Sequence, residues 1–504
     1  MVGRASIGRN GGGSALPRPW LLVVLVAISS AAALMLEIVA GRLVAPYLGM
    51  SLYTWTAIIA VVLAGLSLGS LIGGRLADGP LARGRNRLVA ALGLAAVFTL
   101  LTPVLLRRTA ALTGAGDLAP TAEVLILASA MLLVPSVFAG IVSPLAARLA
   151  LAQTPADDTG RLLGRIFAAG AVGSIVGTLL AGFVLIGHLG SLTSVVLIAA
   201  LYAATALAAS APVGRLPALA LMAAAGGIVW GAGESAGAWR SPCIAESAYS
   251  CIRLADGTAP GAGPSRRLVI DHLTHGINVR DDPDVFVMGY IDLADSLARR
   301  RFEGVPARSF FLGGGAYTLP RAWDAAGGTV VVAEIDPLVT RIARDRLWFE
   351  PGTDLEVIHA DARRALAGQP AKARFQVIFG DAFQDVTVPP HLVTREFAKA
   401  VRTRLTADGL YMVNVIDAAR DPAFVAALAR TLETHFRQVT VWRERAPAAG
   451  RVNHLVVATD RPLTAETVIG DDVFARRWIT IAVDRAAAPV LTDDHSPVAR
   501  LLGR

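Results

Sequence analysis

The sequence predicts two parts of different character: a multi-pass α-helical membrane domain, followed by an α/β Rossmann-like domain with a small N-terminal β lobe. Two observations support this division. Hydrophobic residues make up 54% of the chain, but runs long enough to cross a bilayer occur only before residue 232. After that point, short apolar strands alternate with helical segments, which is typical of a sheet covered by helices.

The first 232 residues predict a tail and about seven spans. Residues 1–18 are glycine-rich and basic, and we expect a disordered tail there. The membrane domain, 19–232, has candidate spans near 19–41, 54–74, 87–106, 122–147, 166–187, 191–209 and, least clearly, 216–231. Glycines repeat at every fourth position in two spans and are expected to let helices pack closely: Gly65, Gly69, Gly73, Gly173 and Gly177.

Arginines predict the orientation of the spans. They gather in the tail, in the 75–87 and 148–165 loops and at Arg215, whereas the alternate loops carry few. Because basic loops stay in the cytoplasm, the tail is expected to be cytoplasmic. Seven spans would then leave everything after residue 232 outside the cytoplasm. A re-entrant 216–231 segment, or a further crossing in another hydrophobic stretch, would return it to the cytoplasm, so the side of the soluble part stays open.

The chain has two cysteines, Cys243 and Cys251, just past the last apolar segment. Their spacing is compatible with a disulfide, and two free thiols are an equally open interpretation. A disulfide would suit an extracytoplasmic location of the soluble part. A nucleoside cofactor supplied in the cytoplasm would not reach that location. Two cysteines do not form a zinc site, and we expect no metal. The net charge of +8 is attributed to membrane loops, so the expected partner is the lipid bilayer and not nucleic acid.

Residues 233–300 are predicted to form a junction and the small β lobe. The junction is rich in glycine, proline and serine. A strand is expected at 267–271, and a helix at 285–297 carries Tyr290 and Asp292.

The last segment, 301–504, begins with a nucleotide-binding pattern. An apolar strand ends in Gly313, Gly314 and Gly315, and a second apolar strand ends at Glu334. Glycines let the backbone approach a ligand, and an acid at the carboxyl edge of the second strand can accept hydrogen bonds from ribose hydroxyls. A ribose-bearing cofactor is therefore predicted. The alternative is a tight turn in an ordinary α/β sheet, since Thr318 stands where the dinucleotide fingerprint has its third glycine.

The alternation continues to the end of the chain. Pro337 is expected to open a helix, and strands at 355–361 and 375–381 end in Asp361 and Asp381. The remaining elements are helix 391–405, strand 409–415, helix 422–434 and a closing pair of strands at 438–442 and 454–458. Because ligands of open α/β sheets bind at the carboxyl ends of the strands, Glu334, Asp361 and Asp381 are expected to converge.

With these acids in place, residues 243–500 resemble the spermidine synthase family, which are aminopropyltransferases built on the S-adenosylmethionine methyltransferase fold. They resemble more closely the membrane-fused, spermidine synthase-like proteins of bacteria. The matching pieces are Glu246-x-x-Tyr249, Leu268-x-Ile270-Asp271, Gly313-Gly314-Gly315, Glu334-Ile335-Asp336, His359-Ala360-Asp361, Gly380-Asp381-Ala382-Phe383, residues 388–397 and residues 491–497.

The resemblance implies a role for each candidate site residue. Gly313, Gly314 and Gly315 would line the cofactor, Glu334 would hold the ribose, and Asp361 would accept from the adenine amino group. Asp381 would be the catalytic carboxylate. The candidates for lining the amine substrate are Tyr290, Asp292, His275, Asp385, Asp493 and Asp494. His275 is equally open to being a surface loop residue.

The function implied is a membrane-anchored aminopropyltransferase that uses decarboxylated S-adenosylmethionine and putrescine or a related amine. Two departures weaken this chemistry: Ala316 stands where the family has an aspartate, and Gln384 replaces a second acid. The alternatives are a methyltransferase that uses S-adenosylmethionine on an unknown acceptor, and a non-catalytic polyamine- or nucleoside-binding module. The resemblance further implies a multi-pass protein of the bacterial inner membrane, and a homodimer as a hypothesis.

Overall fold

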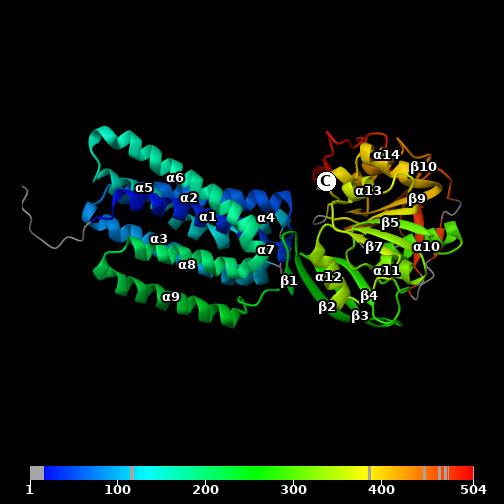
Figure 1. Cartoon of the computed structure of the whole chain (residues 1–504), viewed down its shortest axis with the longest axis horizontal. Coiled ribbons are helices and arrows are strands. Elements are labelled where there is room, and N and C mark those ends of the chain that lie inside the picture. Colours follow the sequence, from blue (N-terminus) through cyan, green and yellow to red (C-terminus); the bar gives the residue numbers. More distant parts are fainter. Residues whose placement is uncertain are drawn as a thin grey trace, which may run out of the picture. The chain divides into compact units, whose positions relative to one another are not determined.

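The structure is a computed structural model that describes residues 16–113, 119–383, 387–445, 450–463, 467–469, 474 and 476–502. The chain divides into two compact units, Met1–Ser250 and Cys251–Arg504. Figure 1 shows that the first consists of long helices and that the second is built around a β-sheet.

The first unit is a bundle of long helices. Its α-helices are α1 (Pro19–Leu48), α2 (Leu52–Ala77), α3 (Leu81–Thr113), α4 (Pro120–Ala128), α5 (Val134–Leu151), α6 (Thr159–Leu180), α7 (Ile186–Leu189), α8 (Ser191–Ala209) and α9 (Arg215–Ala236). Two π-helical turns, Ser129–Leu133 and Ala181–Leu185, join α4 to α5 and α6 to α7. Within the described residues, seven helical segments are long and apolar enough to cross a membrane. The short strand β1 (Ala245–Glu246) follows the bundle.

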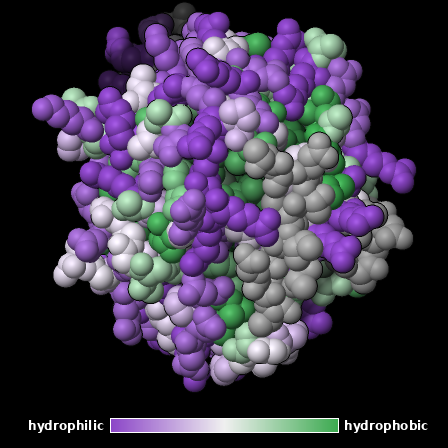
Figure 2. Space-filling view, turned by 90° about the vertical axis from the view of Figure 1, so that its right-hand side faces the viewer, coloured by the Kyte–Doolittle hydropathy of each residue, from purple (hydrophilic) through white to green (hydrophobic). Residues whose placement is uncertain are grey.

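The outer surface of the bundle is apolar. Large side chains such as Phe167 and Phe183 are 73% and 78% exposed, and Ile228 on α9 is 75% exposed. By contrast, the face of the second unit that Figure 2 shows is mostly hydrophilic, with apolar residues in small groups. A surface of this kind on the bundle is suited to lipid contact.

Glycines set the closest helix contacts in the bundle. A Cβ atom on Gly69 of α2 would lie 2.1 Å from the carbonyl oxygen of Val137 in α5. A Cβ atom on Gly173 of α6 would lie 2.0 Å from the carbonyl oxygen of Ala27 in α1. The predicted packing role of these glycines is therefore confirmed, because the backbones approach more closely than any side chain would allow.

The second unit begins with a small antiparallel lobe. Its strands are β2 (Cys251–Ala259), β3 (Gly263–Ile270) and β4 (Leu273–Val279), and each pairs with the next. The helix α10 (Gly289–Phe302) follows and leads into the large sheet. It begins and ends later than the 285–297 segment predicted from the sequence.

The large sheet has nine strands in the order β12-β13-β10-β11-β9-β8-β5-β6-β7. Strands β9, β8, β5, β6 and β7 are parallel, and the remaining pairings are antiparallel. The strands are β5 (Arg308–Leu312), β6 (Thr329–Ala333), β7 (Leu355–Ile358), β8 (Phe375–Gly380), β9 (Leu405–Ala418), β10 (Gln438–Glu444), β11 (Arg451–Thr459), β12 (Thr467–Ile469) and β13 (Arg477–Ile481).

Helices cover both faces of this sheet. They are α11 (Thr318–Ala325), α12 (Pro337–Arg346), α13 (Ala362–Ala367), α14 (Arg395–Arg404), α15 (Ala423–Leu432) and α16 (Val498–Leu502). Trp323 of α11 packs on Phe311 of β5, with ring centroids 5.4 Å apart, whereas α13 to α16 share a core with Phe310 on the other face. β8 is buried at every position except Gln376, so it is apolar at nearly every position and does not alternate. The predicted fold class is confirmed.

Gly69 offers a test of the bundle. Substitution of Gly69 by valine is expected to lower the free energy of unfolding of the first unit by about 1–3 kcal/mol, because the side chain must displace the α5 backbone. Gly74, on the same helix, is the matched control, because a Cβ added there would meet no neighbouring segment within 4 Å. Thermal unfolding of the full-length protein in detergent should show a lower midpoint for Gly69→Val only. Equal midpoints for Gly69→Val and Gly74→Val would contradict the packing role.

Candidate active site

The glycine turn lies at the carboxyl end of β5, next to the end of β8. The N–H of Gly313 donates to the carbonyl of Ala333 at 2.9 Å, and the N–H of Asp381 donates to the carbonyl of Leu312 at 3.0 Å. Gly313 has a φ of +97°, and a Cβ there would lie 3.0 Å from the backbone oxygen of Asp381. The turn therefore requires glycine, both for its backbone conformation and for its approach to β8.

Glu334 holds the glycine turn from the end of β6. Its Oε2 accepts from the N–H of Gly314 at 2.8 Å and of Gly315 at 3.4 Å, and its Oε1 accepts from the N–H of Asp336 at 2.9 Å. Burial raises the pKa of Glu334, and these three bonds oppose that rise. These bonds use three of the four lone pairs of the carboxylate, so Glu334 retains one acceptor position, on Oε1, for a ribose hydroxyl. The turn and Glu334 thus fit the nucleoside that the sequence predicts.

Tyr317 follows the turn and is directed into the core. Its ring stacks on Phe349 with centroids 4.2 Å apart, and its hydroxyl lies 2.7 Å from that of Thr340 on α12. A Cβ on Gly314 would lie 2.4 Å from this ring. Tyr317 therefore supports the turn from within the fold.

Asp381 is bound by two side chains from different elements. Tyr290 of α10 donates to its Oδ2 at 2.9 Å, and Asn414 of β9 donates to its Oδ1 at 2.8 Å. Asn414 in turn accepts from Asn453 of β11 at 2.9 Å. Both oxygens of the predicted catalytic carboxylate are thereby fixed in position.

The residues around Asp381 shift its pKa. Burial raises the pKa of Asp381 to about 7, although the bonds from Asn414 and Tyr290 lower it in part. Burial also raises the pKa of Tyr290 well above its usual value, and the adjacent carboxylate adds to this. Tyr290 therefore stays a donor at neutral pH, while Asp381 changes charge there. A group that titrates near neutrality can accept a proton during a reaction.

His275 lies where β4 of the small lobe meets the glycine turn. A Cβ on Gly315 would lie 3.0 Å from the carbonyl oxygen of His275, and the His275 ring lies 6.5 Å from the ring of Phe383. Burial, with a contribution from His272, lowers the pKa of His275 to about 4, so it is neutral at physiological pH. The structure places His275 beside the turn and the segment that follows Asp381.

Ala316 is enclosed by β4 as well. Asn278 donates to its carbonyl at 2.9 Å, and the Cβ position of Gly276 lies 2.4 Å from the Cβ of Ala316. Ala316 is 2% exposed. An aspartate at this position, as the resembled family has, would have no room unless β4 moved.

β7 ends at Ile358, earlier than the predicted strand 355–361, and Asp361 lies at the N-terminus of α13, where it has two hydrogen-bond partners. Its Oδ2 lies 2.7 Å from Nε2 of His391, and its Oδ1 accepts from the N–H of Arg364 at 3.1 Å, so it caps α13. Burial alone would raise the pKa of Asp361, but these bonds lower it. No described contact joins Asp361 to the glycine turn. Its adenine-binding role stays a prediction.

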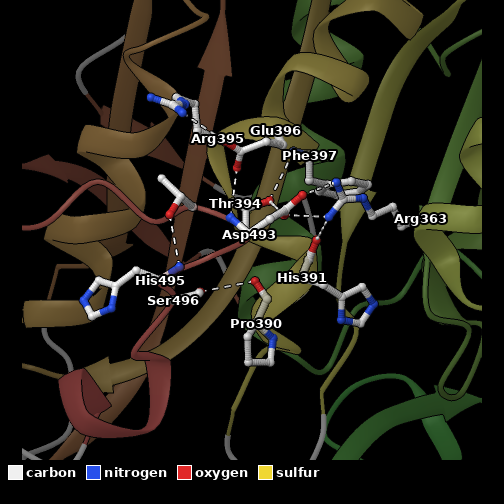
Figure 3. A network of polar contacts seen from close by, with 11 residues as sticks. Arg363, Pro390, His391, Thr394, Arg395, Glu396, Phe397, Asp493, His495 and Ser496 are labelled. Atoms are coloured by element: carbon white, nitrogen blue, oxygen red, sulfur yellow. Dashed lines mark hydrogen bonds and ion pairs between the residues drawn. The ribbon is translucent and has the colours of Figure 1, made fainter.

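Asp493 belongs to a network that also contains His391, the partner of Asp361, and that Figure 3 shows. Its carboxylate accepts two bonds of 2.7 Å from Arg363 and one of 2.7 Å from Thr394, and its N–H donates to Glu396 at 3.0 Å. The bonds from Arg363 lower the pKa of Asp493 to about 2. This carboxylate links the C-terminal segment to α13 and α14. Its role in binding an amine stays a prediction, and a neighbouring arginine already balances its charge.

The remaining candidates have no described contact with Asp381. Asp292 is buried, and its Oδ2 accepts from the indole of Trp478 at 3.4 Å. Asp494 is exposed. Asp385 lies outside the described residues, as does Gln384. The described site therefore brings together the glycine turn, Glu334, His275, Tyr290 and Asp381, and roles for the others stay predictions.

Sequence reasoning overlooked Asn414, Asn453 and His391. The signal for Asn414 was a single amide within the apolar run 411–415 of the predicted strand 409–415. Among the described residues, no group of three or more histidine, cysteine or acidic side chains could hold a metal ion.

Comparisons with known proteins bear on the second half of the chain. No protein-family model matches. A polyamine aminopropyltransferase of Vibrio vulnificus (strain CMCP6) is 30% identical over 132 residues, which cover 25% of this chain and 43% of that protein. A probable polyamine aminopropyl transferase of Bifidobacterium longum (strain NCC 2705) is 27% identical over 189 residues, which cover 33% of this chain and 42% of that protein. The chain thus spans less than half the length of either relative.

Among solved structures, a probable spermidine synthase from Corynebacterium glutamicum ATCC 13032 aligns with a TM-score of 0.43 and 19% identity, over 50% of this chain and 95% of that one. The two curated relatives confirm the predicted resemblance to the spermidine synthase family.

The raised pKa of Asp381 predicts how the free energy of unfolding depends on pH. Its pKa is about 7 in the folded protein, against an ordinary value of 3.8. Between these values the folded protein keeps a proton that the unfolded chain has released, so the free energy of unfolding should fall as pH rises. Asp381→Asn should remove this part of the slope and be more stable than the wild type at pH 8.

Thermal unfolding of the full-length protein from pH 4 to 8 measures this slope. Asp256→Asn is the control, because the Asp256 side chain is 77% exposed. An unchanged slope in Asp381→Asn would show that Asp381 is ionised throughout this range.

Proposed function

We propose that this chain, whose second half is spermidine synthase-like in sequence, is a membrane-anchored aminopropyltransferase. It would transfer an aminopropyl group from decarboxylated S-adenosylmethionine to putrescine or a related amine. One observation carries the proposal: a buried carboxyl with a pKa of about 7, Asp381, lies beside a glycine turn that is held by Glu334.

The proposed chemistry needs a base at this position. The co-substrate supplies a carbon beside a positively charged sulfur. The nitrogen of a neutral amine forms a bond to this carbon, the carbon–sulfur bond breaks, and its electron pair stays on sulfur. The amine nitrogen then releases a proton, which the ionised Asp381 accepts. General bases are most effective when their pKa lies near the working pH.

Tyr290 and the glycine turn would assist in different ways. The Tyr290 hydroxyl donates to Oδ2 of Asp381 and leaves the second lone pair of that oxygen for the amine. The turn, with no Cβ between Leu312 and Ala316, would let the nucleoside approach the ends of β5 and β8. Glu334 would accept from a ribose hydroxyl.

Contacts within the first unit support a proposal for the location of the second. Arg85 of α3 donates to the carbonyl of Ala209 at the end of α8, and Gln153 after α5 donates to the carbonyl of Pro17 before α1. These contacts place the arginines of the 75–87 and 148–165 segments at the same end of the bundle. We propose that this end faces the cytoplasm.

The opposite end of the bundle holds the chain that leads to the second unit. Arg42 of α1 donates to the carbonyls of Ser247 and Tyr249, Arg107 of α3 donates to that of Arg240, and Ser191 of α8 donates to Glu246. Both cysteines are disulfide-bonded. Seven candidate spans among the described residues, with the arginine-rich end in the cytoplasm, support an extracytoplasmic second unit. The disulfide-bonded cysteines support the same location, because disulfides persist in oxidising compartments.

This location favours a second candidate function. Outside the cytoplasm, a nucleoside co-substrate has no obvious supply, whereas a module that binds a polyamine without turnover needs no nucleoside. The enclosed Ala316, in place of an acid, also supports weaker amine chemistry. Binding without product formation would favour this module over the transferase.

Turnover is the direct test of the transferase. The full-length protein, with decarboxylated S-adenosylmethionine and putrescine, should form spermidine at a rate that rises with pH through about 7. Asp381→Asn should lower this rate by about 10²–10⁴-fold while calorimetry still detects the nucleoside. Asp295→Asn, a buried acid bonded to Trp323 on the same unit, is the control. Undiminished turnover in Asp381→Asn would rule out its role as base.

Reporter fusions test the location. Alkaline phosphatase fused after residue 250 should be active, and the same enzyme fused at residue 80, in the α2–α3 loop, should be inactive. A fluorescent protein that folds only in the cytoplasm should give the reverse pattern. An inactive phosphatase at residue 250 would return the second unit to the cytoplasm and remove the main support for the binding module.

A further inference from the structure

We propose that Asn414 and Asn453 are positioning residues for Asp381: their linked amides fix the orientation of its side chain from β9 and β11. This inference rests on the proposed function for its consequences in catalysis. Its structural part concerns Asp381 alone and can be tested without any substrate.

The hydrogen bonds define one arrangement of the amides. Asn414 accepts at Oδ1 from Nδ2 of Asn453, so its own Nδ2 is directed to Asp381. If the Asn414 amide rotated by half a turn, its oxygen would face the carboxylate oxygen and its NH₂ would face that of Asn453. Both contacts would then be repulsive. Asn453 therefore reinforces the orientation of Asn414 that the accepting carboxylate requires.

The sheet register explains how two residues distant in sequence meet. Asn414 is paired with Leu455 and Ile416 with Asn453 in the antiparallel β9–β11 ladder. Asn414 and Asn453 are thus diagonal neighbours on one face of the sheet, where long side chains can reach one another. Val415 follows Asn414 directly in β9 and is directed to the opposite face.

The amides would act together with Tyr290. Tyr290 binds Oδ2 from α10, and Asn414 binds Oδ1 from β9, so rotation of the carboxyl would break both bonds. Asn414 is 2% exposed, which excludes water as an easy replacement for its amide. Two fixed donors leave the remaining lone pairs of the carboxylate in defined directions for a reacting amine.

The inference has a signature that a merely structural role lacks. A donor to a carboxylate stabilises its ionised form, so the loss of the donor must raise the pKa of Asp381. Burial and the bonds from Asn414 and Tyr290 are what set this pKa, and Tyr290 remains a neutral donor. Asn414→Ala should therefore move the acidic limb of activity to higher pH. General damage to the sheet would lower activity at every pH.

The experiment is an infrared titration of the Asp381 carboxyl in the full-length protein, with its band identified by loss in Asp381→Asn. Asn414→Ala should raise the pKa by about one to two. Asn453→Ala should raise it less, because the Asn414 amide is freed to rotate. Asn414→Asp should raise it most, since two adjacent carboxyls cannot both ionise. Val415→Ala is the matched control and should leave the pKa unchanged while lowering the unfolding midpoint.

The same variants should change kinetics if the wild type has turnover. For Asn414→Ala, kcat/KM at pH 7 should fall about tenfold or more and recover towards pH 9. An unchanged pKa in Asn414→Ala, or a raised KM at every pH, would overturn the inference and make Asn414 a sheet residue or a ligand contact. A wild type without turnover would overturn the proposed function only, because the titration needs no substrate.

Discussion

The parallel pairing of β5 with β8 is the constraint on which the candidate site depends. Leu312 is paired with Gly380, so both strands end at the same level. After β5 the chain continues to β6, which lies on the side of β5 away from β8. At this point the connections of the sheet diverge, which is where open α/β sheets bind their ligands. The glycine turn and Asp381 are adjacent only because the two strands are in this register. A shift of one residue would direct Asp381 to the opposite face of the sheet.

The site is built at a cost in stability. Glu334 and Asp381 are carboxyls whose pKa values are raised by burial, so their ionised forms are less favourable here than in water. Three backbone N–H donors partly offset the unfavourable burial of ionised Glu334. Two of them belong to the glycine turn, so the same bonds hold the turn in its conformation. Asp381 has two side-chain donors, and its pKa of about 7 lies near neutrality. A carboxyl with this pKa can exchange a proton under physiological conditions.

The fold was predictable from the sequence where one local rule decided the outcome. Apolar length predicted the spans, and apolar runs followed by glycines or acids predicted the strands β5, β6, β7 and β8. The contacts that complete the site were not predictable, because they depend on register between distant strands. Asn414 and Asn453 meet only through the β9–β11 ladder, and His391 reaches Asp361 from a segment thirty residues later. The Arg363 bonds to Asp493 also join residues far apart in sequence, so a carboxylate expected to meet an amine meets an arginine.

Location and chemistry are connected through the charge of Asp381. A group with a pKa of about 7 is mostly ionised in a compartment above that pH and mostly neutral in one below it. On the cytoplasmic side, near neutrality, a large share of the molecules would hold the carboxylate that can accept a proton from an amine. Outside the cytoplasm the pH follows the medium, and in an acidic medium Asp381 would be a neutral hydrogen-bond donor. The same residues would then bind a ligand without the base that turnover needs, so the orientation of the helical bundle and the pH of the medium would together select between the two proposed functions.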